Sequence, residues 1–165
     1  MDLDWLKTRI RSATDVETAL RDSSADLCKS FNADRMTVYR VSEDGGSLAA
    51  IVQTNLEQYG AIKVKVAPGR SLAGYVGATK KIVNIADAYD DGELAPFQMQ
   101  RKMFMAVDER TGYRTRQVLA APVVSGGRLV GVVEMLNRLD QQRFPAACEK
   151  DIVTLCEAIA PALEK

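Results

Sequence analysis

Two long apolar segments separated by a tight turn constrain the fold of this chain most strongly. Residues 116–124 and 128–137 are rich in valine and leucine, and Ser125-Gly126-Gly127 lies between them. Valine and other β-branched residues favour strands, and glycine accommodates the backbone of a short turn. Apolar runs of this kind belong in the middle of a sheet. We therefore expect an antiparallel hairpin at the centre of a β-sheet.

The segment before this hairpin carries further strand patterns. Residues 35–41 alternate, with Thr37, Tyr39 and Val41 on one face and Met36 and Val38 on the other. The following turn, Glu43-Asp44-Gly45-Gly46, predicts that residues 47–53 pair back as a hairpin. Shorter strands are expected over residues 62–66, where lysines alternate with apolar residues, and over 82–85.

Helical patterns occupy both ends of the chain. Thr14 and Glu17 have the spacing of a capping box, so we expect the main N-terminal helix to start with Thr14 as its cap. The stretch before it, with Trp5 and Leu6, is expected to form a separate short helix. Residues 145–163 carry one apolar stripe at helical spacing, made by Ile152, Leu155, Cys156, Ile159 and Leu163.

The middle of the chain is predicted to be an insertion of loops and short helices. Ser71 is expected to cap a short helix, and the polar segment 86–111 is expected to hold a helix around residues 96–104 and a functional loop. An acidic run in this segment is interpreted as a solvated loop in preference to a metal site. Met99, Met103 and Met105 are interpreted as an adaptable loop or pocket wall. The acidic run consists of Asp87, Asp90, Asp91 and Glu93.

Together these patterns predict an α+β fold. We expect a central antiparallel sheet of about six strands, with the terminal helices on one face and loop and short-helix insertions on the other. The whole chain, residues 1–165, is expected to be a single domain, with 1–13 as an N-terminal linker or dimer helix. A space enclosed between sheet and insertion could hold a small ligand.

Composition excludes several functional classes. The chain contains no histidine, which removes Ser-His-Asp and Cys-His nucleophile pairs, His-ligated haem and His-containing zinc sites. Lys+Arg and Asp+Glu are both 22, which argues against nucleic-acid binding. The three cysteines, Cys28, Cys148 and Cys156, lack CxxC spacing and are expected to pack in the core or at a dimer interface. An acidic N-terminus and the absence of a long apolar run indicate a cytoplasmic chain without a membrane anchor.

Four blocks of sequence carry a family resemblance. Residues 69–76 (GRSLAGYV), 82–89 (IVNIADAY), 107–116 (VDERTGYRTR) and 131–138 (GVVEMLNR) resemble the GAF domains of cyclic-nucleotide phosphodiesterases and related adenylyl cyclases. The resemblance runs from about residue 31 to the last helix. It implies a buried pocket for a cyclic nucleotide or another small molecule, and dimerisation through terminal helices.

The resemblance also implies a set of ligand-binding residues. They are Thr37, Leu72, Ala73, Asp108, Thr111, Thr115 and Glu134. The backbone amides around residues 71–73 would open a helix and attract a phosphate. Thr111 and Thr115 are four residues apart and could both direct hydroxyls at a ligand. The alternative interpretation of Asp108, Thr111 and Thr115 is that they cap turns and loops.

The sequence departs from the family pattern at two places. Asn137, Phe144 and Glu149 match, but Arg138 and Cys148 stand where the family carries a Lys–Asp ion pair. Arg138 is expected to pair with Glu149 or Asp151 instead. The second departure is Gln53-Thr54, in place of the aromatic-acid pair that reads the purine base, which weakens the case for a nucleotide.

These inferences predict a regulatory, non-enzymatic domain. Its ligand could be cyclic GMP or cyclic AMP, with no other cofactor and no metal, and it would signal through its terminal helices, as a homodimer, to an output domain in a longer chain. The alternative is a ligand-free GAF domain that serves dimerisation or protein interaction. A third possibility, a methionine sulfoxide reductase, is disfavoured because the cysteines lie on predicted helices outside the pocket segments.

Overall fold

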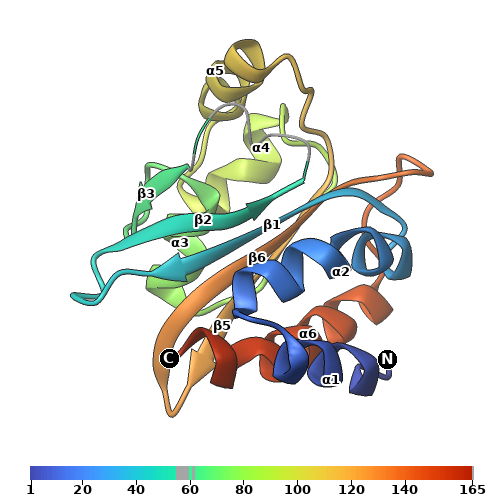
Figure 1. Ribbon diagram of the computed structural model, residues 1–165. Helices are drawn as coiled ribbons and strands as arrows, with labels where there is room; N and C mark the ends of the chain where they lie inside the picture. Colours follow the sequence, from blue (N-terminus) through green and yellow to red (C-terminus); the bar gives the residue numbers. More distant parts are fainter. Residues whose placement is uncertain (55–59, 61, 165) are drawn as a thin grey trace.

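The computed structural model describes residues 1–54, 60 and 62–164 and contains one central sheet (Figure 1). Its strand order within this part of the chain is β3-β2-β1-β6-β5-β4, and every neighbouring pair is antiparallel. The α+β fold with six strands is therefore as predicted. The strands are β1 (Ala33–Val41), β2 (Ser47–Gln53), β3 (Lys63–Lys65), β4 (Val83–Ile85), β5 (Val118–Ser125) and β6 (Arg128–Arg138).

The register of β1 divides its side chains between two cores. Thr37 pairs with Gln53 on β2 and with Glu134 on β6, so these three positions form one row across the sheet. Met36 and Val38 point to the opposite face, where they join the core under the terminal helices. The alternation predicted for residues 35–41 is confirmed.

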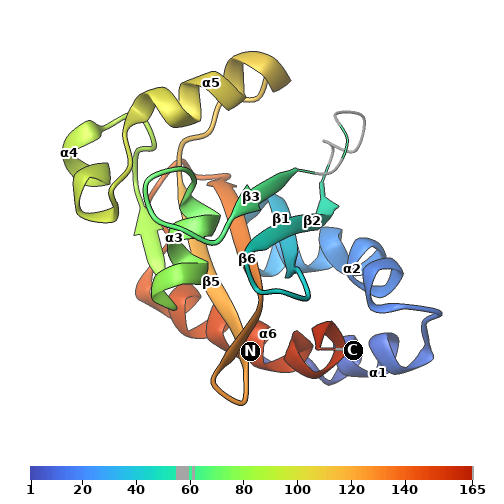
Figure 2. The same ribbon diagram turned by 90° about the vertical axis from the view of Figure 1, so that its left-hand side faces the viewer.

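Three helices cover one face of the sheet. They are α1 (Asp4–Ser12), α2 (Val16–Ser30) and α6 (Ala146–Leu163), which lie together on that face in both views (Figures 1 and 2). Phe31 and Phe144 are fully buried in this core, which also contains Leu6 of α1 and Leu3 directly before that helix. The segment 1–13 is thus packed onto the rest of the domain.

The cap of α2 differs from the predicted one. Asp15, not Thr14, is the N-cap, and its Oδ1 accepts a hydrogen bond from the Thr18 amide at 2.7 Å. Glu17 does not return to the cap but pairs with Arg21, four residues on, at 2.9 Å. A carboxylate one position closer to the helix can reach the same free amides, so the capping-box assignment was wrong by one residue.

The insertions cover the other face of the sheet. They include α3 (Leu72–Thr79), α4 (Asp91–Leu94), the 3-10 turn η2 (Ala95–Phe97) and α5 (Arg101–Thr111). Ser71 caps α3 as predicted, accepting from the Gly74 amide at 3.0 Å. The helix expected around 96–104 is wrong in position, because Pro96 lies in η2 and Gln98 has a left-handed φ of 56°.

The acidic run serves as caps and anchors within this insertion. Asp90 caps α4, and Asp91 accepts a hydrogen bond from the first amide of α5, that of Arg101, at 2.7 Å. Glu93 accepts from the amides of Ala86 and Asp87, and its contact with the Arg143 guanidinium is 2.8 Å. Among the described residues, no group of three or more carboxylates and thiols is placed to hold a metal ion.

The helices of the described chain are also unsuited to crossing a bilayer. None of them combines the length and the apolar composition that a membrane span needs.

Candidate functional site

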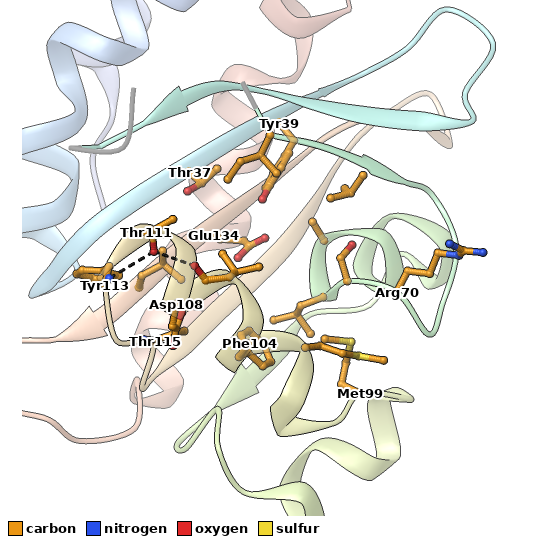
Figure 3. Close-up of a pocket in the computed structure, with 18 residues that line it drawn as sticks. Thr37, Tyr39, Arg70, Met99, Phe104, Asp108, Thr111, Tyr113, Thr115 and Glu134 are labelled. Atoms are coloured by element: carbon orange, nitrogen blue, oxygen red, sulfur yellow. Dashed lines mark hydrogen bonds between the residues drawn. The ribbon is translucent and has the colours of Figure 1, made fainter. Parts of the chain in front are cut away.

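A cavity lies between the sheet and the insertions (Figure 3). Its empty volume is about 800 Å³, part of which is open to solvent. Most of the wall is apolar, and a few polar groups converge on the interior, as is common in small-molecule sites. The lining residues are Thr37, Tyr39, Ile62, Val64, Arg70, Ser71, Leu72, Ala73, Met99, Met103, Phe104, Val107, Asp108, Thr111, Tyr113, Thr115, Glu134 and Leu136.

All seven residues selected from the sequence line this one cavity. Thr37 and Glu134 form its floor on β1 and β6, and Leu72 and Ala73 come from the start of α3. The remaining three, Asp108, Thr111 and Thr115, come from α5 and the loop that follows it. The fold therefore brings together residues from four separate segments. Their contact with a ligand stays a prediction.

The α3 end of the cavity offers hydrogen-bond donors. Within the described part of the chain, the amides of Leu72 and Ala73 have no hydrogen-bond partner, as expected for a helix N-terminus. Gly74 allows this end to sit tightly, because a Cβ there would clash with the carbonyl oxygen of Lys65. Such an end is suited to a negatively charged ligand group.

Asp108 connects three segments around the cavity. Its carboxylate accepts hydrogen bonds from the Thr115 amide at 2.8 Å, from the Thr115 hydroxyl at 2.7 Å and from the Tyr89 hydroxyl at 2.7 Å. The Arg114 guanidinium lies 3.6 Å from the centre of the Tyr89 ring. Asp108 and Thr115 thus satisfy each other, and the loop-capping interpretation holds for this pair in the present structure.

Thr111 is not stacked above Thr115 on a helix. α5 ends at Thr111, where Gly112 has a φ of 73° and closes the helix. The Thr111 hydroxyl donates to the Val107 carbonyl at 3.0 Å and accepts from the Tyr113 amide at 3.3 Å. Both residues line the cavity, and the expectation that both hydroxyls are directed at a ligand stays a prediction.

The exit from α5 is tied to the sheet through Tyr113. Its hydroxyl donates to Asp34 at 2.7 Å and accepts from the Asn137 side chain at 3.0 Å, and the Arg35 guanidinium stacks 3.6 Å from its ring centre. Asn137 also donates to the Arg114 carbonyl and accepts from the Arg116 amide. Sequence reasoning did not assign Tyr113 to the site, although it lies within the block 107–116 that carries the resemblance.

The floor of the cavity carries one deeply buried carboxyl group. Glu134 is 8% exposed, and burial raises its pKa from the ordinary 4.5 to about 7, while a hydrogen bond with the Tyr39 side chain acts in the opposite direction. Tyr39 was not selected from the sequence. Its position two residues from Thr37 on an alternating strand is the signal that could have found it.

Comparison with known proteins assigns the chain to a family. A sequence model of the GAF domain matches residues 15–163. The chain belongs to the GAF domain family. Over 121 residues, or 68% of the chain, it is 26% identical to a probable 3′,5′-cyclic phosphodiesterase, pde-5, of Caenorhabditis elegans. Over 89 residues, or 53% of the chain, it is 34% identical to the dual 3′,5′-cyclic-AMP and -GMP phosphodiesterase 11 of Drosophila melanogaster.

These relatives are much longer than the present chain. The matched part covers 15% of the first and 6% of the second. Among solved structures, the GAF domain of a phosphoenolpyruvate-protein phosphotransferase from Coxiella burnetii superposes with a TM-score of 0.77 at 22% identity. That match covers 98% of this chain and 90% of the other. It shows that the two share a fold.

At two positions where this GAF domain departs from the family pattern, the side chains of Gln53 and Arg138 bind nearby residues of the chain. Gln53 does not line the cavity; its side chain donates to the Gly60 carbonyl at 2.8 Å and accepts from the Ile62 amide at 3.1 Å. Arg138 binds Asp140 at 2.6 Å and neither Glu149 nor Asp151, so its expected partner was wrong. Asp140 lies two residues away in the same turn, and such a local pair costs little chain entropy to form.

The three cysteines lie in the core on the helical side of the sheet. Cys28 belongs to α2, Cys148 and Cys156 belong to α6, and all three are buried. Burial raises the pKa of Cys28 to about 11 and that of Cys156 to about 12, and it also raises that of Cys148. A reactive thiol has a lowered pKa and is accessible from the site, whereas these three thiols have raised pKa values and are buried on the helical side of the sheet. Their role in this GAF domain is packing.

Proposed function

We propose that this GAF domain is a regulatory sensor that binds a cyclic nucleotide in the cavity and transmits binding through its terminal helices. One observation carries the proposal: the seven residues to which the phosphodiesterase resemblance points converge on one partly open cavity. Its relatives named above are cyclic-nucleotide phosphodiesterases.

The two ends of the cavity match the two ends of such a ligand. Free amides at Leu72 and Ala73, with the exposed Arg70 beside them, suit a cyclic phosphate. The opposite floor offers oxygen atoms from Thr37, Tyr39 and Glu134, which suit the N–H groups of a purine base. Apolar lining side chains such as Phe104 and Leu136 offer contacts for the flat faces of the base and for the carbon atoms of the ribose.

The helix α5 supports a role for ligand-dependent movement. Hydrogen bonds hold α5 to other segments at Arg101 and at Asp108, its buried residue, while Met103 and Phe104 between them are only partly buried against the core. Met103, Phe104 and Val107 face the cavity, and Val107 is still 41% exposed. A ligand that covers these side chains makes more contacts when α5 lies closer to the sheet, so it favours that arrangement. Such a difference in contacts between two arrangements is what links ligand binding to a structural change elsewhere.

A thermal-shift panel of cyclic and linear nucleotides, amino acids and 2-oxo acids tests the proposal. Cyclic GMP or cyclic AMP should raise the melting temperature, because a ligand at about 100 times its Kd stabilises the folded state by about 2.7 kcal/mol. Thr37→Val, which removes a hydroxyl from the cavity floor, should reduce the shift. Thr154→Val, on α6 across the sheet, should not. The absence of any shift with both nucleotides would contradict the proposal.

A second candidate function is dimerisation through the terminal helices, with or without a ligand. Trp5 on α1 is 37% exposed and Val153 on α6 is 38% exposed, and the two helices pack against each other. Light scattering at high micromolar concentration measures the mass directly. A dimer supports this candidate, and a monomer contradicts it.

A further inference from the structure

Glu134 occupies a position where an ionised group has little support. It lies in the middle of β6 between Thr37 on β1 and Ala120 on β5, and its side chain points into the cavity (Figure 3). Its neighbours two residues away on the same face, Val132 and Leu136, are buried and apolar. A carboxylate in such surroundings needs hydrogen bonds or an opposite charge.

The described groups around Glu134 supply no opposite charge. On β1 the facing groups are the hydroxyls of Thr37 and Tyr39, and Tyr39 is the side-chain hydrogen-bond partner of Glu134. β5 contributes Ala120 at this row, and α3 contributes the uncharged Leu72 and Ala73. Across the described residues, Glu134 forms no ion pair.

Among the described residues, three other titratable or charged groups line the same cavity but are engaged or distant. Asp108 on α5 is held by Thr115 and Tyr89. Tyr113, in the loop after α5, directs its hydroxyl to Asp34. Arg70, in the loop before α3, is exposed and lies at the far end of the cavity from Glu134 in Figure 3. Ile62, just before β3, and Val64 of β3 also line the cavity and carry no charge.

The ionised and neutral forms of Glu134 therefore both occur near neutral pH in the empty domain. Burial raises the pKa of the carboxyl to about 7, as described above. The two forms offer different hydrogen-bond patterns. A carboxylate only accepts, whereas a carboxylic acid donates one hydrogen bond and accepts others.

We propose that Glu134 is the specificity-determining residue of the cavity and selects the ligand by the pattern of donors and acceptors on its polar edge. The carboxylate accepts hydrogen bonds from two adjacent N–H groups, as on the edge of guanine. The carboxylic acid donates one hydrogen bond and accepts one, which fits a base edge with a donor beside an acceptor, as on adenine. This inference rests on the proposed function, and it adds that the preference between the two ligands changes with pH.

Calorimetric titration of the domain with cyclic GMP and with cyclic AMP, between about pH 5.5 and pH 8.5, tests the inference. The two bases keep their charge over this range. The ratio of the cyclic AMP Kd to the cyclic GMP Kd should rise at least about tenfold with pH, since a matched pair of hydrogen bonds discriminates between bases by that order.

Two variants separate Glu134 from other groups. Glu134→Gln fixes one donor and one acceptor at the same place, so it should prefer cyclic AMP and lose the pH dependence of the ratio. Asp108→Asn changes the other carboxylate of the cavity and should keep that pH dependence, whatever its effect on affinity.

The outcomes distinguish this inference from the proposed function. A Kd ratio that is constant with pH, or a pH dependence that persists in Glu134→Gln, overturns the inference while nucleotide sensing stands. If neither nucleotide binds at any pH, both are overturned. NMR of the carboxyl carbons in the empty domain adds a test that needs no ligand: Glu134 should titrate near neutrality, and titration near 4.5 overturns the inference.

Discussion

At the residue scale, the two carboxyl groups among the described lining residues have opposite surroundings. Asp108 accepts three hydrogen bonds, from Tyr89 and Thr115, and so connects α5 to the segments that contain these two residues. Glu134 has the phenol of Tyr39 and no cation among the described residues. The first positions α5, and the second is the carboxyl group that we propose contacts the ligand.

The pH dependence of stability should report the burial of Glu134. Its folded pKa of about 7 lies above the ordinary 4.5, so the folded state holds the proton while the unfolded state releases it. Stability should therefore fall as pH rises from 4.5 to about 7, by up to about 3 kcal/mol. Glu134→Gln has no proton to lose and should be more stable than the wild type at about pH 8, but not at pH 4.5. Urea denaturation at the two pH values measures the difference. A wild type that is the more stable protein at the higher pH would contradict the account.

Removing the Asp108 carboxylate should loosen the loop after α5. Asp108→Ala leaves the Thr115 amide, the Thr115 hydroxyl and the Tyr89 hydroxyl without their acceptor. The expected loss is about 1–3 kcal/mol in the free energy of unfolding. Tyr89→Phe removes one donor and leaves the other two bonds, so its loss should be smaller. Equal losses of stability for the two substitutions in denaturant titrations would argue against the role of Asp108 in holding this loop.

At the element scale, α3 and α5 differ in how firmly they are held. Six of the eight residues of α3 are buried, whereas α5 buries Asp108. Helices with few buried contacts open at low free-energy cost. We therefore expect α3 to be the rigid wall of the cavity and α5 to be the wall that moves when a ligand binds.

Hydrogen exchange should show this difference directly. Backbone amides of α5 should exchange faster than those of α3 and α6 in the empty domain. Cyclic nucleotide should slow exchange in α5 more than elsewhere, because the bound ligand would cover Met103, Phe104 and Val107. Protection of α5 already equal to that of α6 without ligand would show that the helix is not a movable wall.

The close packing of α3 gives a second test at this scale. In Gly74→Ala the added methyl would overlap the carbonyl oxygens of Lys65 and Ala67, so the start of the helix must shift. We expect a loss of about 1–3 kcal/mol and weaker nucleotide binding. Gly77→Ala, on the same helix, is the matched control, because its methyl meets the flexible end of Leu129. Unchanged binding in Gly74→Ala would show that the α3 end does not contact the ligand.

At the scale of the whole molecule, the sequence predicted what local periodicity controls. Alternation placed Thr37 and Tyr39 on one face of β1, and glycine turns identified both hairpins. The choice of partners was not predictable in this way. Arg138 binds Asp140, two residues away in the same turn, whereas the family pattern had placed its partner on the following helix. Asp108 binds Tyr89, which lies 19 residues away. This second pairing depends on the folded positions of separate segments, so sequence reasoning that placed Asp108 in the cavity could not show that its carboxylate was already engaged.

NMR shift mapping with a cyclic nucleotide tests the central claim, that this cavity is the ligand site, most directly. On adding cyclic GMP or cyclic AMP to labelled domain, we predict that amide resonances of Leu72, Ala73 and Thr115 shift with saturation, together with those of α5. Amides of α2, on the far side of the sheet, should change little. No saturable shift with either nucleotide, or shifts confined to α1 and α6, would contradict the account.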